Sequence, residues 1–302
     1  MYLSLKEQVL TLKFHHFSNP LMLAYVKQMR QIKMNTLAFT DMVNLVKSLS
    51  KQFPKDQDLL LKPISDQRMD DLLSQSFIFG DSVYPELWYQ LPQPPVMIFF
   101  RGNLSLLKRP KVSVVGSRKI SPYPKQVTED LVKVLSRAGF VSVSGMAKGI
   151  DQVVHETSIK AKTKASTIAI IATGLNKVYP LDHKDLQAKL AKDHLLLSEF
   201  LPDSPPRKHH FIMRNRLVAG ISPVTVVMEA AHKSGSLITA NYALDYNREV
   251  YALPGRISDP GSQGCNELIA AGAYPYLSSQ SFLHEVMKLQ AYQYGDNRIQ
   301  SL

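Results

Sequence analysis

Glycine, hydroxyl and basic residues occur together in several short segments that follow apolar runs. The first of these segments is Gly116-Ser117-Arg118-Lys119. A glycine allows the backbone to turn sharply, so exposed amide groups and the serine hydroxyl can donate to phosphate oxygens, and Arg118 adds a planar set of donors. A solvent-exposed turn has a similar composition, and the GxGxxG pattern of dinucleotide-binding loops is absent. The segment by itself leaves phosphate binding and a plain turn both open.

A second segment of this kind covers residues 144–151. It contains two glycines four positions apart and Lys148, which adds another cation to a turn lined by amide groups. We expect Asp151, at the end of the segment, to cap or orient the loop rather than to touch a polyanion. A tight turn without any ligand remains equally open.

A third segment covers residues 173–180. Tyr179 offers a ring that could stack on a base or pack against the protein. Lys177, and Lys184 a few positions later, could reach phosphates or remain solvated. The residue types in this segment do not decide between these roles.

Two arginines separated by a single residue form a further motif, Arg214-Asn215-Arg216. Side chains two positions apart on a helix point in different directions. We therefore expect one arginine to meet an anion and the other to pair with Glu199 or Glu229.

Apolar runs and amphipathic segments alternate from residue 111 onward, and this alternation predicts the elements that position the motifs. Repetition of strand, helix and strand requires right-handed crossovers, which predicts an α/β fold with a doubly wound, mainly parallel sheet covered on both faces. The predicted strands are 112–115, 141–143, 168–172, 195–197, 224–228 and 250–253.

The motifs follow successive strands, so a parallel sheet would bring them to one edge, where doubly wound folds bind their ligands. The last of them, Ser234-Gly235-Ser236, opens a helix, where free N–H groups, hydroxyls and the helix dipole favour an anion, although simple capping is also open. The predicted phosphate-binding residues are Gly116, Ser117, Arg118, Lys119, Lys148, Lys177, Lys184, Arg214, Asn215, Arg216, Ser234, Gly235 and Ser236.

The chain that precedes this α/β part has a different pattern. Apolar residues recur at three- and four-residue spacing, and no glycine precedes Gly80, which predicts a small all-helical module. The proline-rich stretch 84–95 predicts an extended connection anchored by Trp88, followed by a short strand at 96–100. We predict three parts: a helical module at 1–75, an α/β domain at 76–290 and a polar tail at 291–302.

Composition narrows the class of protein further. The net charge is +11, of which residues 1–75 contribute +3, so +8 belongs to the α/β part and is available for a polyanionic partner. The single cysteine excludes a disulfide framework and fits a cytoplasmic location. No apolar run approaches the about 18 residues of a membrane helix. Two pairs of histidines are adjacent, His15-His16 and His209-His210, and neighbouring side chains face different ways, so we expect no metal site; we also expect no cofactor.

The motifs together resemble the DprA/Smf family. The resemblance covers roughly residues 80 to 275, in order and with ordinary spacing, and the combination of RNR with SGSLITA is its most specific part. The matching segments are GSR at 116–118, SGMAKGID at 144–151, TGLNKVYP at 173–180, LLLSEF at 195–200, RNRLVAGIS at 214–222, KSGSLITA at 233–240, ALPG at 252–255 and GCNELIAAGA at 264–273.

The resemblance implies an extended Rossmann-like fold that binds single-stranded DNA, forms a homodimer and helps to load the RecA recombinase during natural transformation. Members of this family are not known for catalysis. The family pattern implies that Arg118 is the leading DNA contact and that the N-terminal module is similar to a sterile-alpha-motif domain. Leu268 and Ile269 lie in the part through which the family dimerises, so a core role and a dimer surface are both open for them.

An enzyme acting on small nucleotides is the alternative. Glycine-rich phosphate loops also occur in related folds that hydrolyse nucleotides, and Glu199 or Glu229 would then be the acid–base group. The sequence shows no obvious pair of carboxylates and no Ser-His-Asp arrangement. The residue pattern therefore favours a non-catalytic binder of single-stranded DNA.

Overall fold

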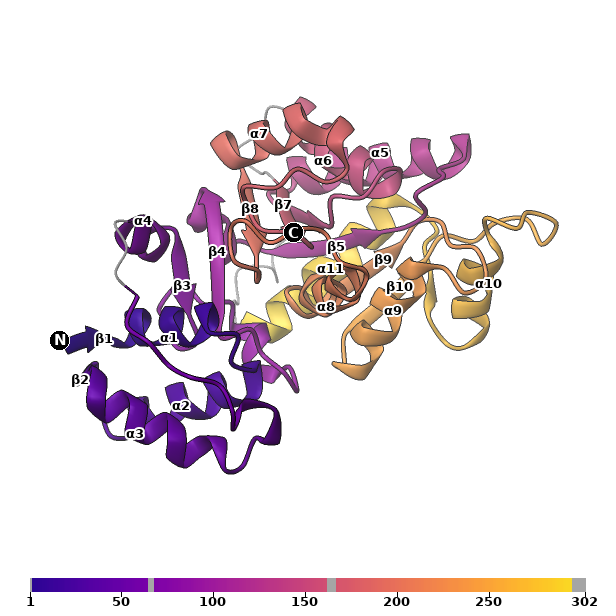
Figure 1. The fold of residues 1–302 in the computed structure, drawn as a ribbon. Helices are drawn as coiled ribbons and strands as arrows, with labels where there is room; N and C mark the ends of the chain where they lie inside the picture. Colours follow the sequence, from indigo (N-terminus) through magenta and orange to yellow (C-terminus); the bar gives the residue numbers. More distant parts are fainter. Residues whose placement is uncertain (1, 65–67, 162–166, 295–302) are drawn as a thin grey trace.

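The computed structural model describes residues 2–64, 68–161 and 167–294, and part of the predicted polar tail lies outside these residues. Its main feature is a nine-stranded sheet in the order β11-β10-β9-β5-β6-β7-β8-β4-β3 (Figure 1). The strands are β3 (Ser76–Ile78), β4 (Met97–Gly102), β5 (Lys111–Val115), β6 (Val141–Ser144), β7 (Thr167–Ile171), β8 (Leu195–Ser198), β9 (Val224–Val227), β10 (Glu249–Ala252) and β11 (Tyr274–Pro275).

The strands from β5 to β10 all pair in parallel, which confirms the predicted sheet. Each of the six predicted strands is within one residue of its observed bounds at both ends. Strand β4 pairs antiparallel with β8 and with β3, and the short strands β3 and β11 extend the two edges beyond the prediction.

Helices cover both faces of the sheet, and side chains of one strand alternate between them. From β7, Ile168 and Ile170 pack in the same cluster as Leu217 of α8, whereas Ala169 and Ile171 point to the opposite face. The helices of this part are α5 (Pro122–Arg137), α6 (Ile150–Lys160), α7 (Lys184–Asp193), α8 (Lys208–Gly220), α9 (Gly235–Asp245), α10 (Gln263–Ala270) and α11 (Ser279–Tyr294).

The N-terminal part lies beside the β3–β4 edge of the sheet (Figure 1). It contains β1 (Tyr2–Ser4), α1 (Leu5–Phe14), α2 (Asn19–Gln31), β2 (Thr36–Ala38), α3 (Phe39–Ser50) and α4 (Arg68–Ser74). The prediction that this part is all-helical is therefore wrong: β1 and β2 pair antiparallel over three residues. These strands are too short and too far apart in sequence to leave a periodic pattern.

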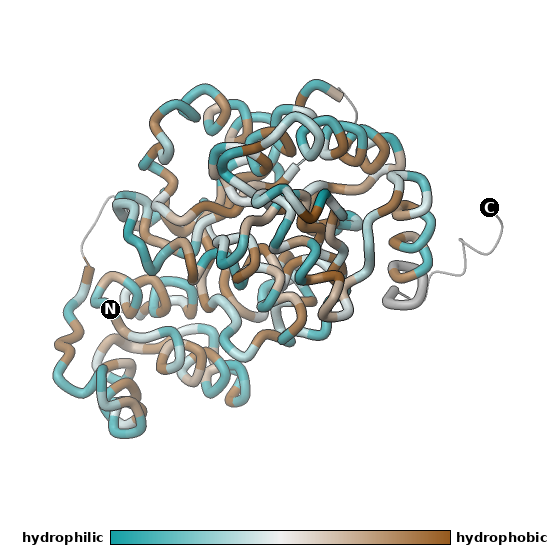
Figure 2. The backbone as a smooth tube through the Cα atoms, turned by 90° about the vertical axis from the view of Figure 1, so that its right-hand side faces the viewer, coloured by the Kyte–Doolittle hydropathy of each residue, from teal (hydrophilic) through white to brown (hydrophobic). Residues whose placement is uncertain are grey.

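The N-terminal helices share a core with the sheet. Tyr25 and Met29 of α2 belong to the same cluster of buried side chains as Phe99 of β4 and Leu196 of β8. Hydrophobic and hydrophilic residues alternate along the outer helices, as expected for helices with one face against the core (Figure 2). No helix among the described residues is long and apolar enough to cross a membrane.

A buried histidine fastens the loop that follows β6. His155 of α6 is fully buried; its Nε2 lies 3.1 Å from the carbonyl oxygen of Gly145, and its Nδ1 lies 2.8 Å from the hydroxyl of Thr167. Burial lowers the pKa of His155 from 6.5 to about 3, so the ring is neutral in the folded protein.

We expect this histidine to make stability depend on pH. The folded pKa lies below that of the unfolded chain, so the unfolded chain binds the additional proton between about pH 6.5 and 3. The free energy of unfolding therefore falls with decreasing pH, by up to about 1.4 kcal/mol per pH unit from this group. The free energy of unfolding, measured with urea at several pH values between 7 and 4, should change less with pH in His155→Gln than in the wild type. The same dependence on pH in both proteins would contradict a buried, neutral His155.

Candidate functional site

A groove lies at the carboxyl edge of the sheet, at the point where strands that follow β5 in the chain are added on its other side. Strand β5 has β6 on one side and β9 on the other, and ligands of doubly wound folds bind at this switch point. The groove has a volume of about 950 Å³. It lies between the loop that follows β5, with Gly116 to Lys119, the N-terminal turn of α9, with Ser234 to Ser236, and the first two turns of α8.

A smaller pocket of about 260 Å³ continues the groove toward the loops that follow β6 and β7. The two share Arg118, Phe211 and Arg214 in their walls, so they form one depression, which we call the binding groove. Met146 and Tyr179 complete an apolar wall of the smaller pocket. The binding groove therefore combines apolar and cationic surfaces.

Arg118 is exposed at the centre of the binding groove. Its guanidinium carbon lies 5.7 Å from the centre of the Phe211 ring, and this ring meets Tyr179 edge to face with centroids 5.3 Å apart. Tyr179 is 41% exposed. No described carboxylate forms an ion pair with Arg118. A cation and two aromatic rings are therefore available to a ligand in the same place.

The loops that follow β5 and β6 approach each other closely, and a glycine makes this possible. Gly149 has φ of +79°, and a Cβ atom there would lie 2.2 Å from the carbonyl oxygen of Ser117. The amide of Ile150 donates to that same oxygen at 3.1 Å. Only glycine fits this position without strain, so Gly149 fixes where the loop with Arg118 lies.

Arg214 is largely buried and forms part of the wall of the binding groove. Its guanidinium donates to the carbonyl oxygen of Ile170 at 3.2 Å and lies 3.9 Å from the carboxylate of Asp151. Asp151 also accepts from the amide of Ala147, so it orients the loop after β6, as the sequence predicts. Burial raises the pKa of Asp151, and the Arg214 charge opposes this shift. A Cβ atom at Gly145 would collide with Arg214, so the motif depends on that glycine.

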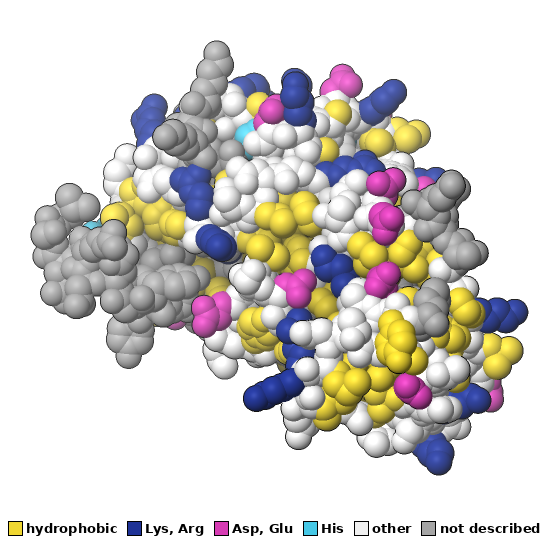
Figure 3. Space-filling view, turned by 90° about the vertical axis from the view of Figure 1, so that its left-hand side faces the viewer, with side chains coloured by type: hydrophobic (Ala, Val, Ile, Leu, Met, Phe, Trp, Pro, Cys, Tyr) yellow, Lys and Arg dark blue, Asp and Glu magenta, His cyan; other side chains and the backbone are white. Residues whose placement is uncertain are grey.

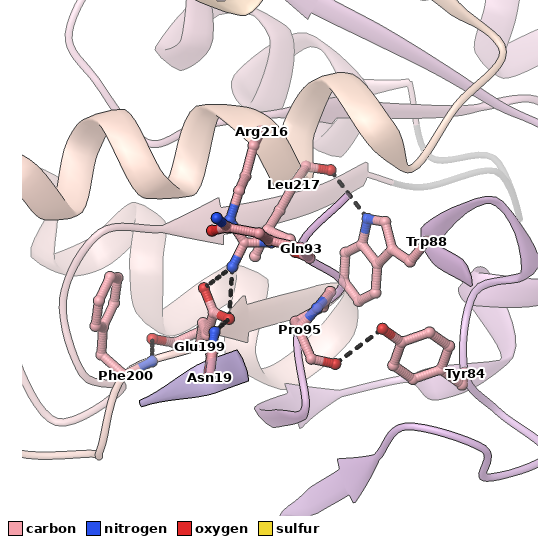
Figure 4. Close-up of polar contacts among 10 residues, drawn as sticks. Asn19, Tyr84, Trp88, Gln93, Pro95, Glu199, Phe200, Arg216 and Leu217 are labelled. Atoms are coloured by element: carbon pink, nitrogen blue, oxygen red, sulfur yellow. Dashed lines mark hydrogen bonds and ion pairs between the residues drawn. The ribbon is translucent and has the colours of Figure 1, made fainter. Parts of the chain in front are cut away.

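The structure corrects the predicted phosphate contact of Arg216. This side chain is 6% exposed and donates through Nη2 to both carboxylate oxygens of Glu199, at 2.6 and 2.5 Å (Figure 4). Its Nη1 donates to the carbonyl oxygen of Gln93 at 2.6 Å. The predicted pairing with Glu199 is confirmed, and it removes Arg216 from the groove surface.

The predicted lysines differ in their positions. Lys119 and Lys148 line the binding groove, and Lys148 forms an exposed ion pair with Asp182. Lys177 and Lys184 are exposed but lie outside the groove lining. The sequence places them after β7, at the carboxyl edge of the sheet, without showing where their side chains reach.

Hydroxyl and amide groups of the remaining motifs face the groove in local turns. The Ser117 hydroxyl donates to the carbonyl oxygen of Lys119 at 2.8 Å, and the hydroxyls of Ser234 and Ser236 lie 2.9 Å apart. The Asn215 amide donates to the carbonyl oxygen of Gly235 at 3.4 Å. These contacts hold the turns, and they connect α8 to the start of α9.

Several groove residues are missing from the sequence prediction, among them the exposed Arg207 and its neighbours on α8. Lys208 and Phe211 lie on the face of α8 that also presents Asn215, at a spacing of three and four residues. This spacing indicates in the sequence that the three residues share one face of a helix. Nothing in the local sequence shows whether that face meets a ligand or the core.

The candidate dimer residues occupy α10. Leu268 is buried in the core beneath this helix, and Ile269 is half-buried against the same cluster. The core role therefore holds for Leu268, and Ile269 is the more accessible of the two.

Both carboxylates of the enzyme alternative have structural partners. Glu199 is paired with Arg216, and Glu229 accepts from the amide of Ser121 at 3.1 and 3.3 Å where α5 begins. The described residues contain no group of three or more His, Cys, Asp or Glu side chains suited to a metal ion.

Basic side chains are dispersed among acidic and apolar ones on the face of the molecule shown in Figure 3. The face that bears the N-terminal part therefore shows no single cationic patch among the described residues. The binding groove differs from it, because Arg118, Lys119 and Lys208 line one depression there.

Comparisons with known proteins agree on one family. Residues 75–287 match the family model of DNA recombination-mediator protein A. The chain is 43% identical over 204 residues to DNA processing protein DprA of Bacillus subtilis, covering 67% of this chain and 68% of that protein.

Similar solved structures include those of two DprA proteins. The first is DprA from Streptococcus pneumoniae, with a TM-score of 0.80 and 34% identity, covering 93% of this chain and 97% of that one. The second is DprA from Helicobacter pylori, with a TM-score of 0.63 and 34% identity, covering 71% and 96%. The latter structure was described for its single-stranded DNA binding mode.

We expect Glu199→Gln to destabilise the fold strongly. The substitution leaves the buried Arg216 cation without a counter-charge, which typically costs about 3–5 kcal/mol of unfolding free energy. Urea unfolding followed by circular dichroism measures this loss. The matched control is Glu267→Gln, which removes an exposed carboxylate paired with His232 and should change stability by about 1 kcal/mol or less. Equal effects of the two variants would contradict a structural role for Glu199.

Proposed function

This chain belongs to the family of DNA recombination-mediator protein A, the DprA/Smf family, and we propose that it binds single-stranded DNA in the binding groove without catalysing a reaction on it. The observation that carries this proposal is the position of Arg118: exposed, free of described carboxylate partners and set against an aromatic ring at the switch point of the sheet. The relative from Helicobacter pylori, which binds single-stranded DNA, supports the assignment.

The groove offers separate surfaces for the backbone and the bases of a strand. Arg118, Lys119 and Lys208 supply cations for phosphates, and the free amides at the start of α9 add donors. Phe211 and Tyr179 supply ring surfaces on which bases of any type can stack. Binding of this kind needs no particular sequence, because the base edges are not read.

The largely buried Arg214, which is 7% exposed in the wall of the groove, adds a further positive charge there. Arg214 stays in place through Asp151 and Ile170, so its charge is fixed before a strand arrives. Preorganised charge of this kind attracts phosphate without a cost for ordering the side chain.

Structural roles for Glu199 and Glu229 support a non-catalytic protein over a nucleotide hydrolase. In addition, a groove about 950 Å³ in volume suits several nucleotides better than one phosphate. Product release from nucleoside monophosphates would favour the enzyme instead.

The finer parts of the proposal follow the family resemblance. We propose that the protein works in the cytoplasm as a homodimer through α10, with Ile269 at the contact, and that it protects incoming DNA and helps to load the RecA recombinase during natural transformation. The half-buried position of Ile269 leaves part of this side chain accessible to a second copy of the chain.

We expect Arg118→Ala to weaken binding of an oligo(dT) strand by about 10- to 150-fold, because it removes charge-assisted hydrogen bonds worth about 1.5–3 kcal/mol. The slope of log affinity against log salt should also become shallower by about 0.7 for each phosphate that the variant no longer neutralises. Fluorescence anisotropy at several salt concentrations measures both quantities. Arg137→Ala, at the exposed C-terminal end of α5 on the opposite edge of the sheet, is the matched control. Unchanged affinity of Arg118→Ala at moderate salt would refute the site.

The aromatic wall gives a second expectation. Phe211→Leu keeps an apolar side chain but removes the stacking surface, which is worth about 1–3 kcal/mol per base. Affinity should fall by about 5- to 150-fold, with the salt dependence unchanged because no charge is removed. Tyr2→Leu removes a 78%-exposed ring outside the groove and serves as the control. A loss of affinity accompanied by a shallower salt slope would argue against stacking.

A further inference from the structure

A buried polar cluster joins the N-terminal part to the sheet. Asn19, the first residue of α2, donates from Nδ2 to Oε1 of Glu199 at 2.6 Å, and the same oxygen accepts from Arg216 (Figure 4). We call these three residues the Asn19 cluster. The side chains of Arg216 and Glu199 are only 6% and 3% exposed, so the amide of Asn19 satisfies a carboxylate that solvent barely reaches.

The N-terminal part holds Asn19 firmly. The preceding Ser18 donates from its amide and its hydroxyl to the two carboxylate oxygens of Asp56, at 2.8 and 2.5 Å. Asp56 is 2% exposed. The start of α2 is therefore anchored within its own part of the chain, and its amide is presented to Glu199 in a fixed position.

Glu199 begins a loop that braces the binding groove. The Phe200 ring stacks on His210 of α8, with centroids 3.8 Å apart. Further along, the amide of Gly174 donates to the carbonyl oxygen of Ser204 at 2.9 Å, which ties this loop to the one after β7. The braced elements carry the groove residues: Tyr179 follows β7, and Lys208 and Phe211 open α8.

Helix α8 links the Asn19 cluster to the only tryptophan of the chain. Trp88 is fully buried, and its indole Nε1 donates to the carbonyl oxygen of Leu217, the residue after Arg216, at 3.2 Å. Arg216 in turn holds the backbone of Gln93 in the same connection. A shift of α8 would therefore change the surroundings of the single tryptophan, whose emission can be excited separately from that of the tyrosines.

We propose that Asn19 is a positioning residue for DNA binding, through which the N-terminal part sets the geometry of the binding groove. Without its amide, the Glu199 carboxylate keeps Arg216 but loses the fixed donor that orients it, so the loop at 199–207 and the first turn of α8 relax. This inference rests on the proposed function. Because coupling between two sites is reciprocal, a strand in the groove must also act on the cluster and on Trp88.

The experiment compares Asn19→Ala with the wild type and with Asn44→Ala, an exposed asparagine on α3 that makes the matched control. Oligo(dT) affinity is measured by anisotropy, and Trp88 emission is recorded with and without saturating DNA. We expect Asn19→Ala to weaken binding about fivefold or more, Asn44→Ala to match the wild type, and DNA to shift Trp88 emission in the wild type and the control but less in Asn19→Ala.

A purely structural role of Asn19 predicts a different pattern. It would lower the midpoint of thermal unfolding while affinity and the emission shift at 20 °C stay as in the wild type, and that result would overturn the proposal. An unchanged Trp88 emission in DNA-saturated wild type would overturn it as well, and this measurement needs no variant. Failure of the wild type to bind DNA would refute the proposed function itself, whereas binding that depends on Arg118 but not on Asn19 would refute only this inference.

Discussion

The structure at the carboxyl edge of the sheet depends on two buried guanidinium cations of helix α8, because each of them needs a carboxylate beside it. An arginine cannot shed its charge, so each buried one requires a carboxylate beside it, and an unpaired buried charge costs several kcal/mol. Arg214 takes Asp151 from the segment after β6, and Arg216 takes Glu199 from the segment after β8. Helix α8 thereby fixes the start of α6 and the loop after β8, through carboxylates that are 48 residues apart in the chain.

The arrangement of the binding groove follows from the pairing of these two arginines with carboxylates. Arg216 lies outside the groove lining and Arg214 is only 7% exposed in its wall, so the more exposed positions of α8 are left to Lys208, Phe211 and Asn215. Gly149 allows the loop with Arg118 to approach from the other side. Cations and aromatic rings therefore meet on a rigid frame. In the binding mode that we propose, this frame lowers the entropic cost of ordering a flexible strand.

Much of this fold could be predicted from the sequence, because buried parallel strands appear as continuous apolar runs and their following loops must share one edge. Other features depend on tertiary partners that no local pattern reveals. The spacing of Arg214 and Arg216 shows that they diverge, but only the position of Glu199 shows that Arg216 is the one removed from the surface.

In the sequence, Phe211 could equally be a core residue. The structure places its ring beside Arg118 and Tyr179 instead. The pairing of β1 with β2 joins segments about 30 residues apart, and each is too short to show a period.

The central claim is that a single strand passes through the binding groove while both buried arginine pairs stay intact. A structure of the protein with a bound oligo(dT) strand tests it most directly. The account predicts phosphates within hydrogen-bond distance of Arg118 and Lys208, a base against Phe211 or Tyr179, and Arg216 still paired with Glu199. A strand bound elsewhere on the surface, or a phosphate held by Arg216 after separation from Glu199, would contradict it.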